Sequence, residues 1–171
     1  MKITLKPSGD IADEIMEELK DKVGGVFHCP VEIEADFGDL AQAYNVERKQ
    51  YLSSELLASL GKAERASRVV GITDVDLYVP RLNFVFGEAD IGAGTAIVSL
   101  YRLSQEYYGL APDEALFLER ATKEIVHELG HTFGLGHCPN SKCVMHFSNS
   151  LADTDLKEAY FCSMCRPKII L

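Results

Sequence analysis

The alternation of apolar and polar positions predicts a sheet of about five strands. Residues 2–6 alternate as a half-buried strand does, and the turn residues Pro-Ser-Gly that follow end the pattern. Residues 26–35 predict a second strand, in which Pro30 indicates either a sheet edge or a regular part that begins only at Val31. The other predicted strands are residues 68–80, which give the clearest pattern, "LNFVF" at 82–86 and "TAIVSLYR" at 95–102.

Apolar residues at helical spacing predict helices around these strands. From Asp10 onwards such residues recur until Gly24 and Gly25, where we expect the first helix to end. Residues 50–62 predict a second helix, and a third begins near Pro112, a residue favoured in the first turn of a helix. The remaining segments, 36–47 and the tail after Gly134, predict loops, apart from a short helix over residues 153–160.

Three histidines in "VHELGHTFGLGHC" have the spacing of a catalytic zinc site. His127 and His131 are four residues apart, so on a helix both side chains can reach one ion. A catalytic zinc usually has three protein ligands and one open position, and His137 can supply the third ligand once Gly134 turns the chain back through a positive φ. Glu128 is placed to act as a general base without being a ligand. The complete pattern, H-E-x-x-H-x-x-G-x-x-H, is far more specific than H-E-x-x-H alone.

Four of the five cysteines form two short-spaced pairs, Cys138 with Cys143 and Cys162 with Cys165. Four thiolates in a closed tetrahedron are typical of structural zinc. Cys138 directly follows His137, and adjacent side chains point in different directions, so we expect Cys138 to bind a second ion. Two disulfides or free buried thiols are the alternative, which is less common for clustered cysteines in an intracellular chain. The cofactors expected are therefore two zinc ions, one catalytic and one structural.

The same residues resemble one family, the archaemetzincins, within the metzincin clan of zinc-dependent metalloproteases. The resemblance rests on H-E-L-G-H-T-F-G-L-G-H-C, then C-V-M and F-C-S-M-C, and covers about a quarter of the chain, from Ile125 to Cys165. It implies the histidine and cysteine ligands given above, Glu128 as the acid/base, and Met145 in a Met-turn beneath the histidines. It also implies a mixed twisted sheet with an antiparallel edge strand, backing helices and an active-site helix.

The elements and the resemblance together predict an α/β (α+β) fold in a single metalloprotease domain over residues 1–171. The sheet and helices occupy residues 1–134, and the zinc-binding C-terminal part occupies residues 135–171. If "LNFVF" is the antiparallel edge strand rather than an internal one, its free backbone groups could pair with an extended peptide.

The charge and the apolar runs limit the partners that we expect. The 17 Lys and Arg residues against 26 Asp and Glu residues give a net charge of −9, which argues against a nucleic-acid partner. No apolar run approaches the roughly 20 residues of a membrane helix, and the N-terminal residues lack a secretory pattern. We therefore expect a monomer in the cytoplasm, with no membrane partner.

The predicted function is zinc-dependent hydrolysis of peptide bonds in a peptide or protein substrate. A non-enzymatic zinc protein with the same fold is the alternative, and Glu128 counts against it because a structural metal site needs no base. Neither the cleavage specificity nor a choice between endopeptidase and aminopeptidase can be read from the sequence. Outside the motif, we expect a packed His28, a buried thiol at Cys29 and a surface position for His146, rather than further metal ligands or a transition-state donor.

Overall fold

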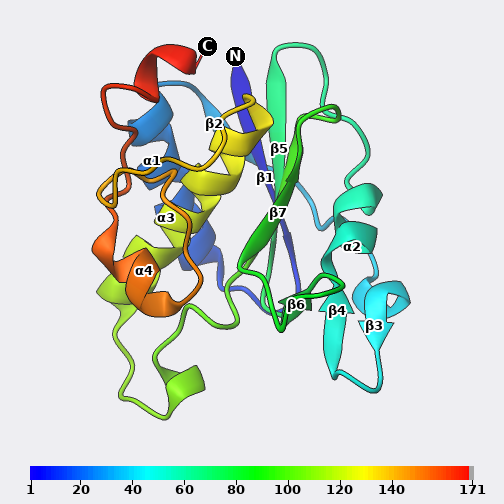
Figure 1. Ribbon diagram of the computed structural model, residues 1–171. Helices are drawn as coiled ribbons and strands as arrows, with labels where there is room; N and C mark the ends of the chain where they lie inside the picture. The colour runs from blue at the N-terminus through cyan, green and yellow to red at the C-terminus, as the bar shows by residue number, and fades with distance from the viewer. Residues whose placement is uncertain (170–171) are drawn as a thin grey trace.

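The computed structural model describes residues 1–169, so the last two residues of the predicted domain, Ile170 and Leu171, lie outside the described part. The main sheet has five strands in the order β2-β1-β5-β8-β7, all parallel except β7, which runs antiparallel to β8 at one edge (Figure 1). The predicted mixed sheet with an antiparallel edge strand is thus confirmed. The strands span β1 (Lys2–Ser8), β2 (Val31–Ile33), β5 (Ser67–Thr73), β7 (Gly87–Asp90) and β8 (Thr95–Ser99).

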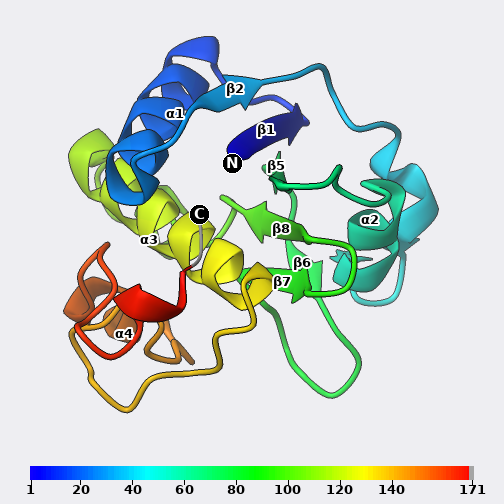
Figure 2. The same ribbon diagram turned by 90° about the horizontal axis from the view of Figure 1, so that it is seen from above.

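Helices cover both faces of this sheet (Figure 2). Helices α1 (Asp13–Phe27) and α3 (Glu114–Thr132) lie on one face, and α2 (Ser53–Ser59) lies on the other. Successive side chains of β8 are buried on opposite faces of the sheet. Val98 packs in the core with α1 and α3, and Ile97 packs in the core with α2. The short helix α4 (Leu151–Leu156) and the rest of the tail lie outside α3. None of the helices described within residues 1–169 is long and apolar enough to cross a membrane.

A second, three-stranded sheet replaces part of the longest predicted strand. Residues 68–80 are not one strand, because β5 ends at Thr73 and the chain enters the small sheet at β6 (Leu77–Tyr78). The carboxylates at the break accept hydrogen bonds, Asp74 from the backbone N–H of Asp10 and Asp76 from the guanidinium of Arg102. The other strands of this sheet are β3 (Tyr44–Asn45) and β4 (Gln50–Leu52), which precede α2 and lie inside the predicted loop and helix.

The antiparallel edge strand is β7, so the assignment of that edge to "LNFVF" is wrong. The backbone of residues 82–86 is irregular because it connects the two sheets. The N–H of Val85 donates to the carbonyl of Leu77 in β6, and the carbonyl of Phe86 accepts the N–H of Ser99 in β8. Regular pairing with β8 therefore begins only at Gly87.

Helix α1 continues through Gly24 and Gly25, where the sequence predicted its end. Val26 and Phe27 are buried, and the ring of Phe27 packs against Phe133 and Phe161. This packing outweighs the roughly 1 kcal/mol that each glycine costs in a helix. His28 then ends the helix in the left-handed conformation with φ of 53°. The expected packing of His28 is wrong, because its side chain is exposed, and Cys29 is half-buried.

Three predicted boundaries shift for local reasons. β1 extends through Pro7, although proline has no N–H to donate within a sheet. This is possible because β2 pairs with β1 only as far as Leu5, so Pro7 lies beyond that pairing. β2 does begin at Val31, at the sheet edge, as the position of Pro30 indicated. The tail helix is α4 rather than 153–160, because the capping box formed by Ser150 and Asp153 begins it earlier. Short 3₁₀ turns occur at Leu40–Ala43, Glu106–Tyr108 and Arg166–Lys168.

Helix α3 lies very close to the edge strand. The side chain of Asp113 accepts the N–H of Leu116 at 3.0 Å and caps the helix just after Pro112. Glu128 lies one turn from the other end of α3. A Cβ added at Gly87 in β7 would lie 2.6 Å from Cγ of Glu128 and 2.7 Å from the carbonyl oxygen of Ile97. Only glycine therefore allows β7 to pass beside Glu128 while pairing with β8.

We expect Gly87→Ala to lower the free energy of unfolding by about 1–3 kcal/mol, because the added methyl group overpacks a site with no free volume. Thermal unfolding of the purified protein measures this effect. Gly25→Ala is the matched control, since nothing lies within 4 Å of its added Cβ and the residue is inside α1. It should be neutral or stabilise by up to about 1 kcal/mol. Equal stability of the two variants would contradict the close approach at Gly87.

Candidate functional site

The structure brings the three histidines of the motif together. His127 and His131 lie on the last turns of α3, and their Nε2 atoms are 3.1 Å apart. Gly134 adopts φ of 83°, the left-handed conformation that the sequence predicted, and the chain turns back so that His137 joins them. One ligand atom from each of the three histidines lies within 4.8 Å of the others.

Backbone carbonyls orient two of these rings. The Nδ1 atom of His127 lies 2.7 Å from the carbonyl oxygen of Val144, and that of His131 lies 2.7 Å from the carbonyl oxygen of Leu135. Because a carbonyl only accepts, both Nδ1 atoms must carry the proton, which leaves both Nε2 atoms as acceptors. Burial lowers the pKa of all three histidines, that of His127 well below its ordinary value. The rings are therefore neutral near pH 7, as metal ligands must be.

The histidine geometry fits a zinc ion. Two nitrogens bound at about 2.05 Å to a tetrahedral zinc are separated by roughly 3.3 Å. The observed 3.1 Å between the Nε2 atoms of His127 and His131 is close to this value. Three neutral imidazoles on one side of a cavity also leave a coordination position free for a water or a substrate, as in catalytic zinc sites.

Glu128 lies in the same cavity and is buried, with 6% of its surface exposed. Burial, and then the nearby carboxylate of Glu124, raise the pKa of Glu128 to about 8, whereas Lys157 lowers it. A carboxyl group with a pKa near the working pH can both accept and return a proton. The structure thus places a carboxyl group that can exchange a proton in the same cavity as the three histidines.

The four cysteines of the tail form a second cluster. The Sγ atoms of Cys138 and Cys162 are 3.8 Å apart, and all four sulfurs lie within 4.8 Å of one another. Sulfurs bound at about 2.3 Å to a tetrahedral zinc are separated by about 3.8 Å, whereas a disulfide requires about 2.05 Å. Burial opposes ionisation of Cys162, but N–H groups of Cys165 and Met164 and the neighbouring thiols bring its pKa down to about 6. The cluster fits a structural zinc and contains no disulfide.

The segment between the two cysteine pairs also supports the histidines. Val144, whose carbonyl holds His127, directly follows Cys143. The N–H of Cys138 donates to the carbonyl of Met145, and the carbonyl of Cys138 accepts a hydrogen bond of 3.0 Å from Nδ1 of His146. His146 thus braces the junction between the clusters, a role that the sequence did not indicate.

Met145 packs directly beneath the histidine turn of α3. It is fully buried, and a Cβ added at Gly130 would lie 2.3 Å from its sulfur. Gly130 stands between Glu128 and His131 in the motif, so the absence of a side chain there lets the Met145 side chain reach the helix. Met145 therefore packs against the turn of α3 that carries His127 and His131, and its place in a Met-turn stays a prediction.

A cavity of about 510 Å³ connects these groups with the edge strand. Residues 81–89, which include most of β7, form one side, and the histidines, Glu124 and Glu128 form another. Phe147, Ser148 and Asn149 complete the lining, and the ring of Phe147 lies 4.9 Å from that of His137, centroid to centroid. Sequence reasoning missed Glu124 and these three residues. Glu124 lies one turn before Glu128, and residues 147–149 begin two positions after Met145, so their places in the sequence would have indicated them.

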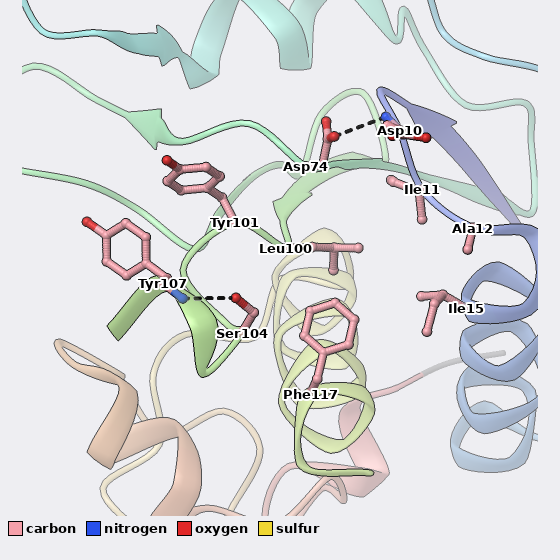
Figure 3. A pocket seen from close by; sticks show the side chains of 10 residues that line it. All are labelled: Asp10, Ile11, Ala12, Ile15, Asp74, Leu100, Tyr101, Ser104, Tyr107 and Phe117. Atoms are coloured by element: carbon pink, nitrogen blue, oxygen red, sulfur yellow. Dashed lines mark hydrogen bonds between the residues drawn. The ribbon is translucent and has the colours of Figure 1, made fainter. Parts of the chain in front are cut away.

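A different cavity, of about 450 Å³, lies at the carboxyl ends of β1, β5 and β8 (Figure 3). Its lining is mostly apolar and aromatic, with Leu100, Tyr107 and Phe117 around it and no histidine or cysteine. The carboxylate of Asp74 at its rim accepts the N–H of Asp10 at 3.0 Å. Within residues 1–169, the clusters suited to a metal ion are therefore the two beside α3.

Comparisons with known proteins point to one peptidase family. The model of peptidase family M54 matches residues 10–170. The archaemetzincin of Methanocaldococcus jannaschii is 45% identical over 170 residues, covering 99% of this chain and 93% of the relative. The archaemetzincin of Pyrococcus furiosus is 43% identical and covers 98% of this chain and 91% of the relative.

Solved structures show the same architecture. A zinc-dependent peptidase from Methanocorpusculum labreanum superposes with a TM-score of 0.90 at 30% identity, covering 98% of this chain and 100% of that one. The archaemetzincin of Archaeoglobus fulgidus, solved with malonate, gives a TM-score of 0.84 at 37% identity and covers 99% of this chain and 100% of that one. The chain therefore belongs to peptidase family M54, the archaemetzincins, and is a zinc-dependent metallopeptidase that acts on peptide or protein substrates.

Proposed function

We propose that His127, His131 and His137 bind the catalytic zinc and that Cys138, Cys143, Cys162 and Cys165 bind a separate structural zinc. The observation that carries this proposal is the pairing of three neutral histidines, two of them oriented by backbone carbonyls, with the buried carboxyl group of Glu128 in one cavity. A thiol cluster with tetrahedral spacing lies apart from that cavity, since none of its sulfurs belongs to the residues that line it.

Glu128 is the general base and then the general acid in this proposal. A zinc ion held by the histidines would lower the pKa of a water and stabilise negative charge on the substrate's carbonyl oxygen. Glu128 accepts the proton from the water as its oxygen adds to the carbonyl carbon of the scissile bond. Glu128 then delivers this proton to the amide nitrogen as the C–N bond breaks, which leaves a carboxylic acid and an amine as products.

The substrate lies along β7 in this proposal. β7 pairs with β8 on one side only, and residues 87–89 line the cavity. An extended peptide can add to such an edge through backbone hydrogen bonds, which bind it with little dependence on its side chains. Phe147, Ser148 and Asn149 line the same cavity and would contact side chains near the scissile bond.

Glu128→Ala should reduce kcat for cleavage of a peptide library by at least about 100-fold, because it removes the carboxylate proposed to move the proton. Zinc content should stay at two ions per chain. Glu119→Ala is the control on the same helix, since 57% of the Glu119 side chain is exposed. Cleavage by a zinc-loaded Glu128→Ala protein at the wild-type rate would refute the mechanism.

Cys162→Ser should lower the zinc content from two ions per chain to one and also reduce the peptidase rate. The reason is that the cysteine cluster fixes the backbone next to the histidines. Val144, whose carbonyl holds His127, follows Cys143, and Cys138 directly follows His137. Cys29→Ser, which changes the cysteine outside the cluster, should keep both ions. Elemental analysis after gel filtration measures both variants, and a single zinc in the wild-type protein would exclude the two-ion proposal.

Once the histidine-bound metal is removed, the free energy of unfolding should depend on pH through the buried carboxyl group of Glu128. Burial raises the pKa of Glu128 to about 8 from the ordinary value of 4.5, so the folded chain holds a proton that the unfolded chain releases. This contribution to stability therefore falls as the pH rises from about 4.5 to 8. After treatment with 1,10-phenanthroline, wild-type protein should lose stability relative to Glu128→Gln across this range. Parallel stability curves for the two proteins would contradict the raised pKa.

A further inference from the structure

A buried ion pair lies one helical turn before Glu128 and has no part in the mechanism above. The Nζ atom of Lys157 is 2.9 Å from Oε1 of Glu124, and the two side chains are 0% and 3% exposed. The hydroxyl of Thr154 donates to the same oxygen at 3.0 Å. Burying two charges costs several kcal/mol per ion, and well-packed apolar residues often stabilise a fold as much. Stability alone therefore does not explain the pair.

The position of Glu124 makes its charge important for Glu128. The two residues are four apart on α3, so their side chains lie on the same side of the helix, and both line the cavity. Two carboxylates with this spacing repel each other, and the repulsion is stronger in a buried site than in water. Lys157, which reaches α3 from the residue after α4, supplies the compensating positive charge.

A neighbouring ion pair joins the same two segments without facing the cavity. The guanidinium of Arg120, one turn earlier on α3, binds both carboxylate oxygens of Asp155 at 2.6 and 2.7 Å. Neither residue lines the cavity that contains Glu128. The Arg120 pair also holds the tail against α3, so the distinctive property of Lys157 is its contact with Glu124, a carboxylate that lines the cavity one turn before Glu128.

We propose that Lys157 is a positioning residue for the peptidase reaction. Lys157 compensates the charge of Glu124, so that the carboxylate of Glu128 stays directed into the cavity. This inference rests on the proposed role of Glu128 as the base. Without Lys157, the uncompensated carboxylate of Glu124 displaces that of Glu128, while the histidines keep their own carbonyl partners, Val144 and Leu135.

The kinetic test compares Lys157→Met with Arg120→Met, each loaded with zinc and assayed well below its unfolding temperature. Lys157→Met should lower kcat roughly 10- to 100-fold, because small misplacements of a reacting group have effects of this size, with KM changed less than about twofold. Arg120→Met should lose thermal stability but keep the wild-type kcat. A wild-type kcat in folded, zinc-loaded Lys157→Met, or an equal loss in Arg120→Met, would overturn the proposal.

Removal of both charges provides the rescue. The amide in Glu124→Gln can still accept the Thr154 hydroxyl, so Lys157→Met/Glu124→Gln leaves no buried charge at the pair. This double variant should recover most of the wild-type kcat, and it can be assayed even if Lys157→Met alone fails to fold. A folded, zinc-loaded double variant with the low kcat would show that compensation of Glu124 is not what Lys157 provides.

A stability measurement tests the electrostatic link without any enzyme activity. In the zinc-loaded proteins, where the positive charge of the metal favours the ionised form of Glu128, Glu128→Gln should raise the unfolding temperature by several degrees more in the Lys157→Met background than in the Arg120→Met background, because only the former contains an uncompensated pair of carboxylates. Equal gains in the two backgrounds would overturn the proposal. If wild-type protein cleaves no peptide but the gains differ, the link stands and the proposed role of Glu128 as the base fails instead.

Discussion

The hydrogen bond between His127 and the carbonyl of Val144, 2.7 Å long, is the constraint on which the rest of the site depends. It sets the tautomer of His127 and directs its Nε2 towards the other two histidines. Val144 is held in turn by the cysteine cluster, through Cys143, and by the carbonyl of Tyr160, which accepts its N–H at 3.0 Å. Helix α3 and the cysteine-rich tail therefore cannot be arranged independently.

Two glycines let the elements approach closely enough for this arrangement. Gly87 allows the edge strand to pass beside Glu128, and Gly130 allows Met145 to pack beneath the histidine turn. Both are positions where a side chain would collide with an atom of the site rather than places where the backbone needs unusual angles. The same close packing encloses Glu124 and Lys157, whose charges compensate each other because both side chains are almost completely buried. The chemistry of the cavity is thus a consequence of how tightly α3 is held between β7 and the tail.

The sequence predicted those parts of the fold and site that depend on local spacing. The ending of α3 and the positive φ of Gly134 follow from patterns within a few residues, whereas the mixed sheet with an antiparallel edge was implied by the resemblance to the archaemetzincins. The errors arose where tertiary contacts decided the outcome. Buried Phe27 carries α1 through two glycines, and Asp76 ends a predicted strand by pairing with Arg102. Contacts between distant residues, such as that of Lys157 with Glu124, leave no periodic signal at all.

X-ray diffraction from crystals of the protein at the zinc absorption edge tests the two-site account most directly. The account predicts two anomalous peaks. One should lie about 2.1 Å from Nε2 of His127 and His131 and from a ring nitrogen of His137, and the other about 2.3 Å from all four sulfurs of the cysteine cluster. A single peak, one ion shared by histidine and cysteine ligands, or a disulfide between Cys138 and Cys162 would contradict it.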